Sequence, residues 1–246
     1  MIKKPENHEP VRIQKVIAQS GIASRRAAED LIRSGEVLLN GEIVKQMGCK
    51  MLIGKDHLSV EGRRVVISPE QKTVVYALYK PKNCITTLND PQGRVTINNF
   101  FPQTSVRLFP VGRLDYDAEG LILLTNDGDL AHKLMHPRHK VSKGYFVKVR
   151  GIVENKALSE LRNGPVIDSH RHQRVRVKIL HNVNDKTWLE LFLREGTNRQ
   201  IKKMFQKIGY PVQKIKRLQI GPIMLGDLQS GESRALSPKE IKQILN

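Results

Sequence analysis

The chain has 246 residues, enough for one large domain or two modest ones, and its 39% apolar content can build a buried core. It has 42 lysines and arginines against 24 acidic residues, a formal net charge of +18, so we expect a polyanionic partner such as nucleic acid. Its two cysteines, Cys49 and Cys84, form no CxxC pair, which argues against a disulfide framework or a cysteine-rich zinc site and favours a reducing cytoplasm. No apolar run is long enough to span a bilayer, and we expect no membrane association.

The first part of the chain predicts a small domain of helices and short strands over residues 11–67. Residues 1–10 are polar, and we expect a flexible tail there. Apolar residues recur at helical spacing over 12–21 and again over 25–34. Asn40-Gly41 then separates two apolar runs, which predicts a β-hairpin.

Two arginines, Arg25 and Arg26, fall in the first turn of the second predicted helix. Positive charge at that end opposes the helix dipole. The placement therefore indicates a phosphate ligand that uses both the helix N-terminus and the guanidinium groups, with two solvated arginines as the alternative.

Residues 68–72 are polar, contain a proline and predict a linker, after which residues 73–246 are rich in strands. Short turns join most of the strands and helices are interspersed irregularly, so we expect an α+β fold with a largely antiparallel mixed sheet flanked by helices. The predicted strands cover 74–79, 106–111, 120–125, 145–149, 175–179, 188–193 and 212–220, and the predicted helices cover 130–135, 155–161, 200–208 and the residues from 237 onward.

A charged loop, residues 112–120, lies between two of the predicted buried strands and contains Asp115. Reactive groups are often held on loops supported by a rigid sheet. Asp115 is therefore a candidate carboxylate nucleophile or general acid/base. Asp117 and Glu119 could join it in a metal site, and a plain charged surface turn is the remaining alternative.

The helix predicted over 200–208 places Lys202 at the edge of its apolar face, beside Phe205, and points Lys203 toward solvent or RNA phosphates. A lysine at a core boundary needs an anionic partner, and we expect that partner to be Asp115. The alternative is a lysine whose ammonium reaches solvent.

Tyr145 begins a predicted strand directly after Lys143-Gly144. An aromatic ring at the lip of a basic crevice can stack on an extruded base, although a tyrosine at the start of a strand is also an ordinary core residue.

Four segments together resemble the RsuA-type rRNA pseudouridine synthases, in the order in which that family has them. The segments are Leu78-Tyr79-Lys80-Pro81, Gly112-Arg113-Leu114-Asp115, Lys143-Gly144-Tyr145 and Arg199-Gln200-Ile201-Lys202-Lys203-Met204. Residues 12–44 are similar to the S4 RNA-binding domain that precedes the catalytic domain in that family. Within it, residues 115–120, 125–128 and 134–137 are most similar to the branch that acts on large-subunit rRNA.

The resemblance implies isomerisation of uridine to pseudouridine in 23S rRNA, with no metal or other cofactor, by a cytoplasmic and monomeric enzyme. It implies catalytic roles for Asp115, Tyr145 and Lys202, the last standing where other branches have arginine. The residues expected to contact RNA are Arg113, Arg199, Lys143, Lys203, Lys80, Arg25 and Arg26. A small-subunit rRNA synthase, a non-catalytic ribosome-assembly factor and a carboxylate-dependent nuclease are the competing interpretations.

Overall fold

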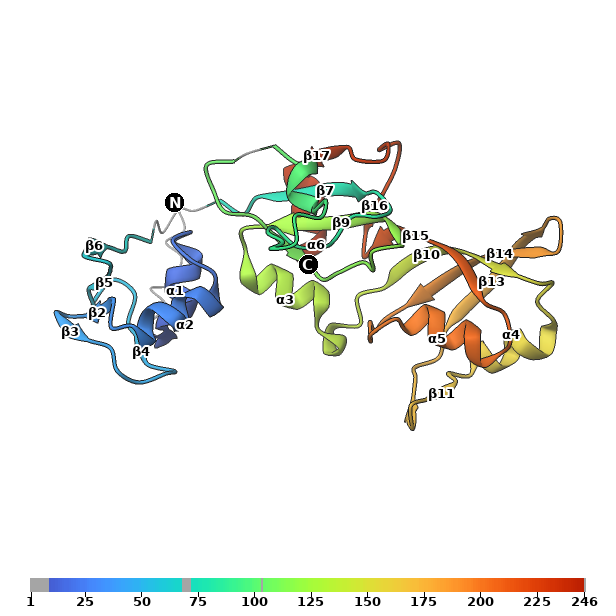
Figure 1. Ribbon diagram of the computed structural model, residues 1–246, viewed down its shortest axis with the longest axis horizontal. Helices are drawn as coiled ribbons and strands as arrows, with labels where there is room; N and C mark the ends of the chain where they lie inside the picture. Colours follow the sequence, from blue (N-terminus) through green and yellow to red (C-terminus); the bar gives the residue numbers. More distant parts are fainter. Residues whose placement is uncertain (1–8, 68–71, 103, 246) are drawn as a thin grey trace. The chain divides into compact units, whose positions relative to one another are not determined.

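The computed structural model describes residues 9–67, 72–102 and 104–245, which form two compact units, Met1–Thr73 and Val74–Asn246 (Figure 1). Residues 1–8 of the expected tail and residues 68–71 of the expected linker lie outside the described residues. Among the described residues, no helix is both long and apolar enough to cross a membrane.

The N-terminal unit consists of two helices and short strands around its own core. Its elements are β1 (Val11–Arg12), α1 (Ile13–Gln19), α2 (Arg25–Arg33), β2 (Val37–Leu39), β3 (Glu42–Ile43), β4 (Lys50–Met51), β5 (Leu58–Val60) and β6 (Arg63–Arg64). The Ser24 side chain caps α2 by accepting a hydrogen bond from the Ala27 amide at 3.0 Å. Asn40 and Gly41 both have positive φ and form the predicted turn between β2 and β3.

The second unit is built on one nine-stranded sheet with the order β13-β14-β10-β15-β9-β7-β17, in which β8 also pairs with β9 and β16 with β15. The β9–β15 pair is parallel and the other pairs are antiparallel, which confirms the largely antiparallel mixed sheet. The strands are β7 (Val75–Lys80), β8 (Phe109–Val111), β9 (Glu119–Thr125), β10 (Lys143–Arg150), β13 (Arg176–Asn182), β14 (Lys186–Leu193), β15 (Val212–Ile220), β16 (Ile223–Met224) and β17 (Ser233–Ala235).

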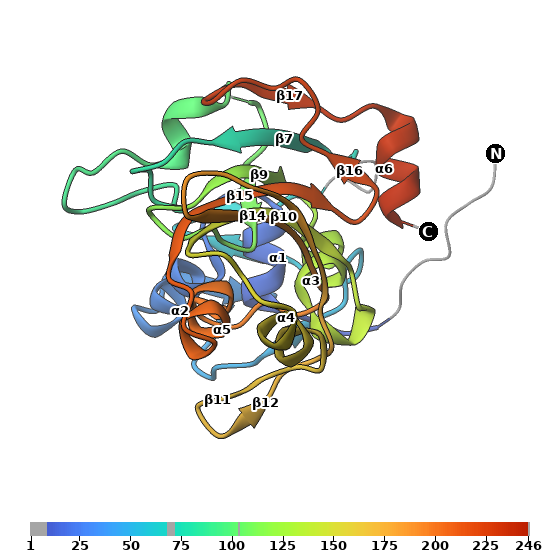
Figure 2. The ribbon, with the colours of Figure 1, turned by 90° about the vertical axis from the view of Figure 1, so that its right-hand side faces the viewer.

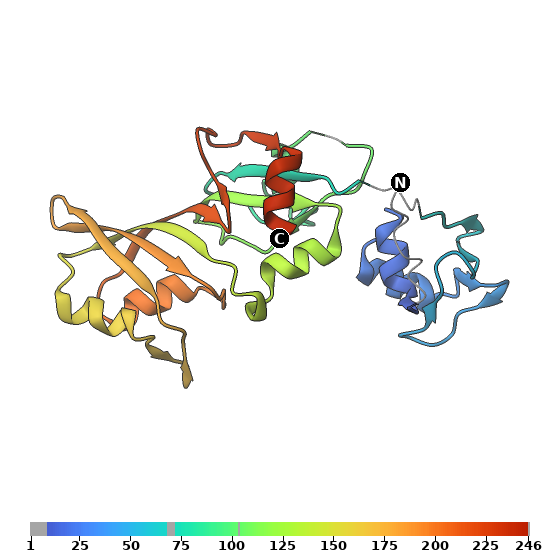
Figure 3. The same ribbon diagram turned by 180° about the vertical axis from the view of Figure 1, so that it is seen from behind.

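The central strand β9 is buried along its whole length, because both faces of its half of the sheet are covered. Leu121 and Leu123 pack with α3 (Gly128–Met135) and α6 (Pro238–Leu245) on one face (Figure 3). Ile122 and Leu124 pack on the other face with the 3₁₀ helix η1 (Ile97–Phe100). A strand buried on both sides reads as a continuous apolar run, as this one does.

The other half of the sheet is covered on one face. Figures 1 and 2 show α4 (Asn155–Arg162) and α5 (Gln200–Lys207) on the same side of β10, β13 and β14. The small hairpin of β11 (Val166–Ile167) and β12 (His170–Arg171) projects on that side too. Alternate residues of β14 are buried against this layer, which accounts for the period of two in its sequence.

The two halves meet at a short parallel junction, where Lys216 and Arg217 of β15 pair with Glu119 and Gly120 of β9. Gly120 has a φ of +106°, and a Cβ there would lie 2.3 Å from the Arg217 carbonyl oxygen. Only glycine allows the two backbones to approach so closely. The junction therefore fixes the residue at position 120.

Some elements differ from the sequence predictions. The strand expected over 106–111 is reduced to Phe109–Val111. The two-residue strands β1, β4, β11, β12 and β16 were not predicted. Such segments are too short for periodicity to be visible, and their pairing depends on tertiary contacts.

We predict that Gly120→Ala lowers the free energy of unfolding by about 3 kcal/mol, because it combines a steric clash with a disfavoured φ. Gly196→Ala is the matched control, since a Cβ at Gly196 meets nothing within 4 Å. Urea denaturation of both variants measures the difference. Equal midpoints for the two variants would contradict the close approach at the β9–β15 junction.

Candidate active site

The loop that carries Asp115 is tied down next to that residue. The Thr86 hydroxyl donates to the Leu114 carbonyl at 2.8 Å and accepts from the Leu114 amide at 3.2 Å. Leu114 and Ala118 are both buried in the core under α5, and the Ala118 amide donates to the Asp115 carbonyl at 3.1 Å. The backbone is therefore fixed on both sides of Asp115, whose side chain stays 34% exposed.

Lys202 of α5 supplies the positive charge nearest to this loop. Its ammonium nitrogen lies 3.7 Å from Oδ2 of Asp115, and its side chain is 19% exposed. Ile201, Met204 and Phe205 anchor α5 in the core, so Lys202 projects from the boundary of the helix's apolar face, as its spacing predicted.

The tighter partner of Lys202 is Asp117, which the sequence did not single out for this role. The ammonium donates to both carboxylate oxygens of Asp117, at 2.5 and 2.6 Å. Burial acts to raise the pKa of Asp117, but the hydrogen bond and charge of Lys202, with a smaller effect of Arg199, outweigh it and lower the pKa. One lysine thus pairs with two carboxylates, the expected partner Asp115 and, at shorter distance, Asp117.

A pocket of about 260 Å³ opens beside Asp115. Its apolar wall comes from α3, β14, α5 and β15, and includes Leu134, Met135, Leu193, Ile201 and Ile215. The polar residues expected at the site that line it are Arg113, Asp115, Lys143, Tyr145, Arg199 and Lys202. An apolar pocket with a few convergent charged groups is the usual form of a binding site.

Two cations on the pocket wall lie close together. Lys143 begins β10, and burial, followed by the charge of Arg217, lowers the pKa of Lys143 to about 8. Arg217 is 5% exposed and donates from Nε to the Leu121 carbonyl at 2.6 Å. Its Nη2 is buried without a hydrogen-bond partner among the described residues. The sequence did not single out Arg217 as a pocket residue, because nothing in the pattern of β15 distinguishes it from Lys214 and Lys216.

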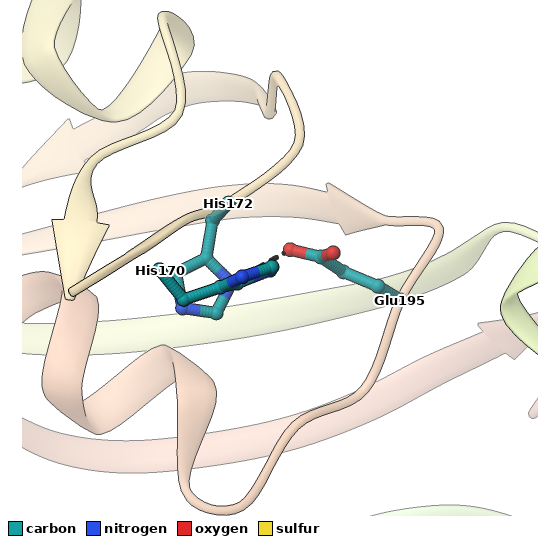
Figure 4. Close-up of side chains that lie close together, drawn as sticks. All are labelled: His170, His172 and Glu195. Atoms are coloured by element: carbon teal, nitrogen blue, oxygen red, sulfur yellow. Dashed lines mark hydrogen bonds and ion pairs between the residues drawn. The ribbon is translucent and has the colours of Figure 1, made fainter. Parts of the chain in front are cut away.

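A buried hydrogen-bond network supports the loop that leads into α5, and Figure 4 shows its contact between His172 and Glu195. Oε1 of Glu195 accepts from the Gln200 side chain at 2.7 Å and from the Gln173 amide at 3.1 Å, and it lies 2.8 Å from Nδ1 of His172. The side-chain oxygen Oε1 of Gln200 accepts in turn from the Thr197 amide at 3.2 Å. Arg199, at φ +52°, is thereby held at the pocket's edge.

His170, His172 and Glu195 also have ligand atoms within 4.8 Å of one another, a donor set that suits zinc. However, the nearest carboxylate oxygen is already engaged by the three nitrogen groups of the network. We therefore interpret the cluster as a hydrogen-bonded support. The sequence also allowed a metal site made of Asp115, Asp117 and Glu119. Glu119 is already engaged, because its carboxylate pairs with the Lys214 ammonium at 2.6 Å.

Lys80 corrects one expectation. Its side chain is fully buried, and its ammonium donates to the carbonyls of Pro81 and Cys84 at 2.7 and 2.8 Å, so it cannot reach an RNA phosphate. Desolvation lowers the pKa of Lys80 to about 8. Its role in this structure is to hold the turn after β7, which explains why a lysine-proline pair ends that strand.

The other expected RNA contacts lie outside the pocket. Lys203 pairs with Asp168 in the turn between β11 and β12. Arg25 and Arg26 are exposed in the first turn of α2, in the N-terminal unit, as their positions predicted.

Comparison with known proteins accounts for both units. The family model described as RNA pseudouridylate synthase matches residues 74–207, more than half of the chain. The chain belongs to the RNA pseudouridine synthase family. The S4 domain model matches residues 11–47, so an S4 RNA-binding domain precedes the synthase domain, as the resemblance implied.

Similar synthases extend over nearly the whole chain. It is 40% identical to ribosomal large subunit pseudouridine synthase B of Bacillus subtilis (strain 168) over 235 residues, 95% of each chain. It is 39% identical over 235 residues to an uncharacterized RNA pseudouridine synthase of Aquifex aeolicus (strain VF5), with 95% and 93% of the two chains covered. A crystal structure of a pseudouridylate synthase has a TM-score of 0.68 at 30% identity and covers 95% of this chain and 99% of its own. Synthases of this family are isomerases that act on RNA, which confirms the predicted enzyme class and the predicted RNA partner.

We predict that Lys143→Met stabilises this synthase at pH 7. The folded-state pKa of Lys143 is about 8, below its ordinary value of 10.5, so the folded state is penalised below about pH 8 and the penalty disappears as the pH rises past 10.5. Because the side chain is partly solvated, we expect a gain on the order of 1–2 kcal/mol at pH 7 and none near pH 11.

Urea denaturation at the two pH values measures this difference. Lys178→Met, at an exposed position of β13, is the control and should change stability equally at both. A Lys143→Met effect that does not depend on pH would contradict the desolvation of this lysine.

Proposed function

We propose that this chain converts one specific uridine of 23S rRNA to pseudouridine, with Asp115 as the catalytic carboxylate. The observation that carries the proposal is a carboxylate on a fixed loop, 34% exposed at a pocket and 3.7 Å from a lysine ammonium. A carboxylate that acts on a sugar must be ionised, partly desolvated and accessible, and this one combines these features.

The reaction breaks the N1–C1′ bond of uridine, rotates the detached uracil and joins C5 to C1′, after which C5 loses its proton and N1 gains one. Atoms balance with no oxidant or reductant. Asp115 takes part either by adding to the nucleoside or by removing a ribose proton, and both routes need its negative charge against the sugar. Lys202 offers that charge a partner of opposite sign, shared with Asp117.

The remaining pocket residues would bind and orient the extruded nucleotide. Tyr145 lines the pocket and can stack on the uracil ring. Arg113 is exposed at the pocket's edge, where it can fill the position left by the base or hold its phosphate. Lys143 and Arg199 add positive charge at the same opening.

The assignment to large-subunit rRNA is supported by the relative that covers 95% of the chain and by the short segments that resemble that branch. In this proposal the S4 domain adds affinity through Arg25 and Arg26, at the N-terminus of α2. A monomer acting on rRNA in the cytoplasm, without a metal or other cofactor, completes the proposal.

Asp115→Asn should lower the rate of pseudouridine formation by about 10³-fold or more, because an amide can neither add to the sugar nor accept a proton from it. Release of tritium from a domain V transcript of 23S rRNA labelled at uridine C5 measures the rate. Asp227→Asn, at an exposed position away from the pocket, is the control and should retain the rate. Turnover by Asp115→Asn would refute the assignment.

Lys202→Met should slow the same reaction by about 100-fold, because it leaves two carboxylates at the pocket without their shared cation. Asp117→Asn should cost less than about tenfold, since Lys202 then pairs with Asp115 alone. Lys207→Met, in the last turn of α5 and exposed, serves as the control for charge. The reverse order, with Asp117→Asn the more damaging change, would make Asp117 the catalytic carboxylate instead.

A further inference from the structure

Neighbouring residues at one end of the sheet face two different hollows. At the end of β14, Leu193 lines the active-site pocket and Phe192 lines a second hollow. At the end of β15, Ile220 belongs to the first and Gln219 to the second. Because successive side chains of a strand point to opposite faces, the two hollows lie on opposite faces of the same strand ends.

The second hollow is basic and aromatic. Its lining consists of one aromatic ring, three polar side chains and three arginines, with no acidic residue: Phe192, Ser142, Gln173, Gln219, Arg174, Arg176 and Arg194. All three arginines are exposed, and none forms an ion pair within the part of the chain that the structure describes. Three like charges around one hollow repel one another, and an anion bound between them removes that repulsion.

The aromatic ring of Phe192 packs closely in the second hollow because its neighbour on β10 is a glycine. Phe192 packs against Gly144 of β10, where a Cβ would lie 3.0 Å from the ring and 3.1 Å from the Gln219 side chain. The Arg176 guanidinium lies over the Phe192 ring, 5.2 Å from its centre. A planar cation on an aromatic ring is a surface on which a nucleobase can also stack.

The same face continues along the strands with similar chemistry. Phe146 and Trp188 stack with ring centres 4.8 Å apart, and the Lys148 ammonium lies over the Trp188 ring at 4.9 Å. The helices α4 and α5 cover the opposite face, and no helix of the described part of the second unit covers this one (Figure 1). Aromatic rings interleaved with cations on an open sheet face are the chemistry of single-stranded RNA binding.

We propose that the hollow of Arg174, Arg176, Phe192 and Arg194 binds one or two unpaired nucleotides next to the target uridine, on the face of the sheet opposite the active site. The inference rests on the proposed function, since it needs the uridine in the first pocket. The chain itself connects the two sites: Ser142 and Lys143, and likewise Arg194 and Glu195, are adjacent residues that line one hollow each. RNA would therefore wrap over this end of the sheet, with phosphates at the arginines and a base on Phe192.

The double variant Arg174→Gln and Arg176→Gln tests the charge. Its affinity for a domain V transcript of 23S rRNA should fall about tenfold or more, and the slope of log affinity against log salt should decrease by about 1.4, the value for two lost contacts to a single strand. Lys239→Gln with Lys242→Gln removes the same charge from exposed positions of α6 and should leave both quantities as in the unsubstituted chain. A double arginine variant that behaves like this control would overturn the proposal.

A photoreactive phenylalanine analogue at position 192 tests the location. It should crosslink to the same transcript within the loop or stem that holds the modified uridine, mapped by reverse-transcription stops. Crosslinks confined to another part of the transcript, or none, would overturn the proposal. Affinity and crosslinking do not require turnover, so absence of pseudouridine formation by the unsubstituted protein would count against the proposed function and not against this hollow.

Discussion

The ammonium of Lys202 stands between two carboxylates that lie more than eighty positions earlier in the chain. Asp115 and Asp117 would repel each other across a partly desolvated site, and the lysine compensates both. Lys202 can compensate both carboxylates only if α5 stays packed against the loop between β8 and β9. The apolar face of α5 and the Glu195 network hold the helix in this position, so packing and hydrogen bonding set the electrostatics of the pocket.

Around the two proposed RNA-binding hollows, several cations have no acidic side chain, in the described part of the chain, that balances their charge. Lys143 and Arg217 share a desolvated wall, and the arginines of the opposite hollow have no acidic partner among the described residues. Charges arranged in this way disfavour the free protein and favour its complex with a polyanion. The net charge of +18 is therefore concentrated, in part, on the surfaces where RNA is proposed to bind.

The orientation of α5 and the turn between β2 and β3 could be predicted from the sequence, for identifiable physical reasons. The helical spacing of Ile201, Met204 and Phe205 fixed the orientation of α5, and hence the boundary position of Lys202. Asn40-Gly41 specified its turn, because both residues accept positive φ. These signals are local and need no knowledge of the remainder of the fold.

What could not be predicted depends on contacts between distant segments. The lysine of a strand-ending Lys-Pro pair gives no local sign that it will be buried under carbonyls, as Lys80 is. Arg217 and Asp117 acquire their roles only when β15 meets β9 and when α5 meets the loop. The strand alternation that produces two hollows was visible in the sequence, but the helix-covered face was not assignable until the sheet order was known.

The parallel junction between β9 and β15 makes the pocket sensitive to the twist between the two half-sheets. Only two residue pairs join the strands there, reinforced by the Lys214–Glu119 ion pair and by the bond from Arg217 to the Leu121 carbonyl. The loop of Asp115 connects two strands of one half-sheet, β8 and β9, while its residues Leu114 and Ala118 pack in the core of the other half, under α5. The distance between the carboxylate and its lysine therefore depends on two contacts at once, the two-rung ladder between the half-sheets and the packing of Leu114 and Ala118 under α5.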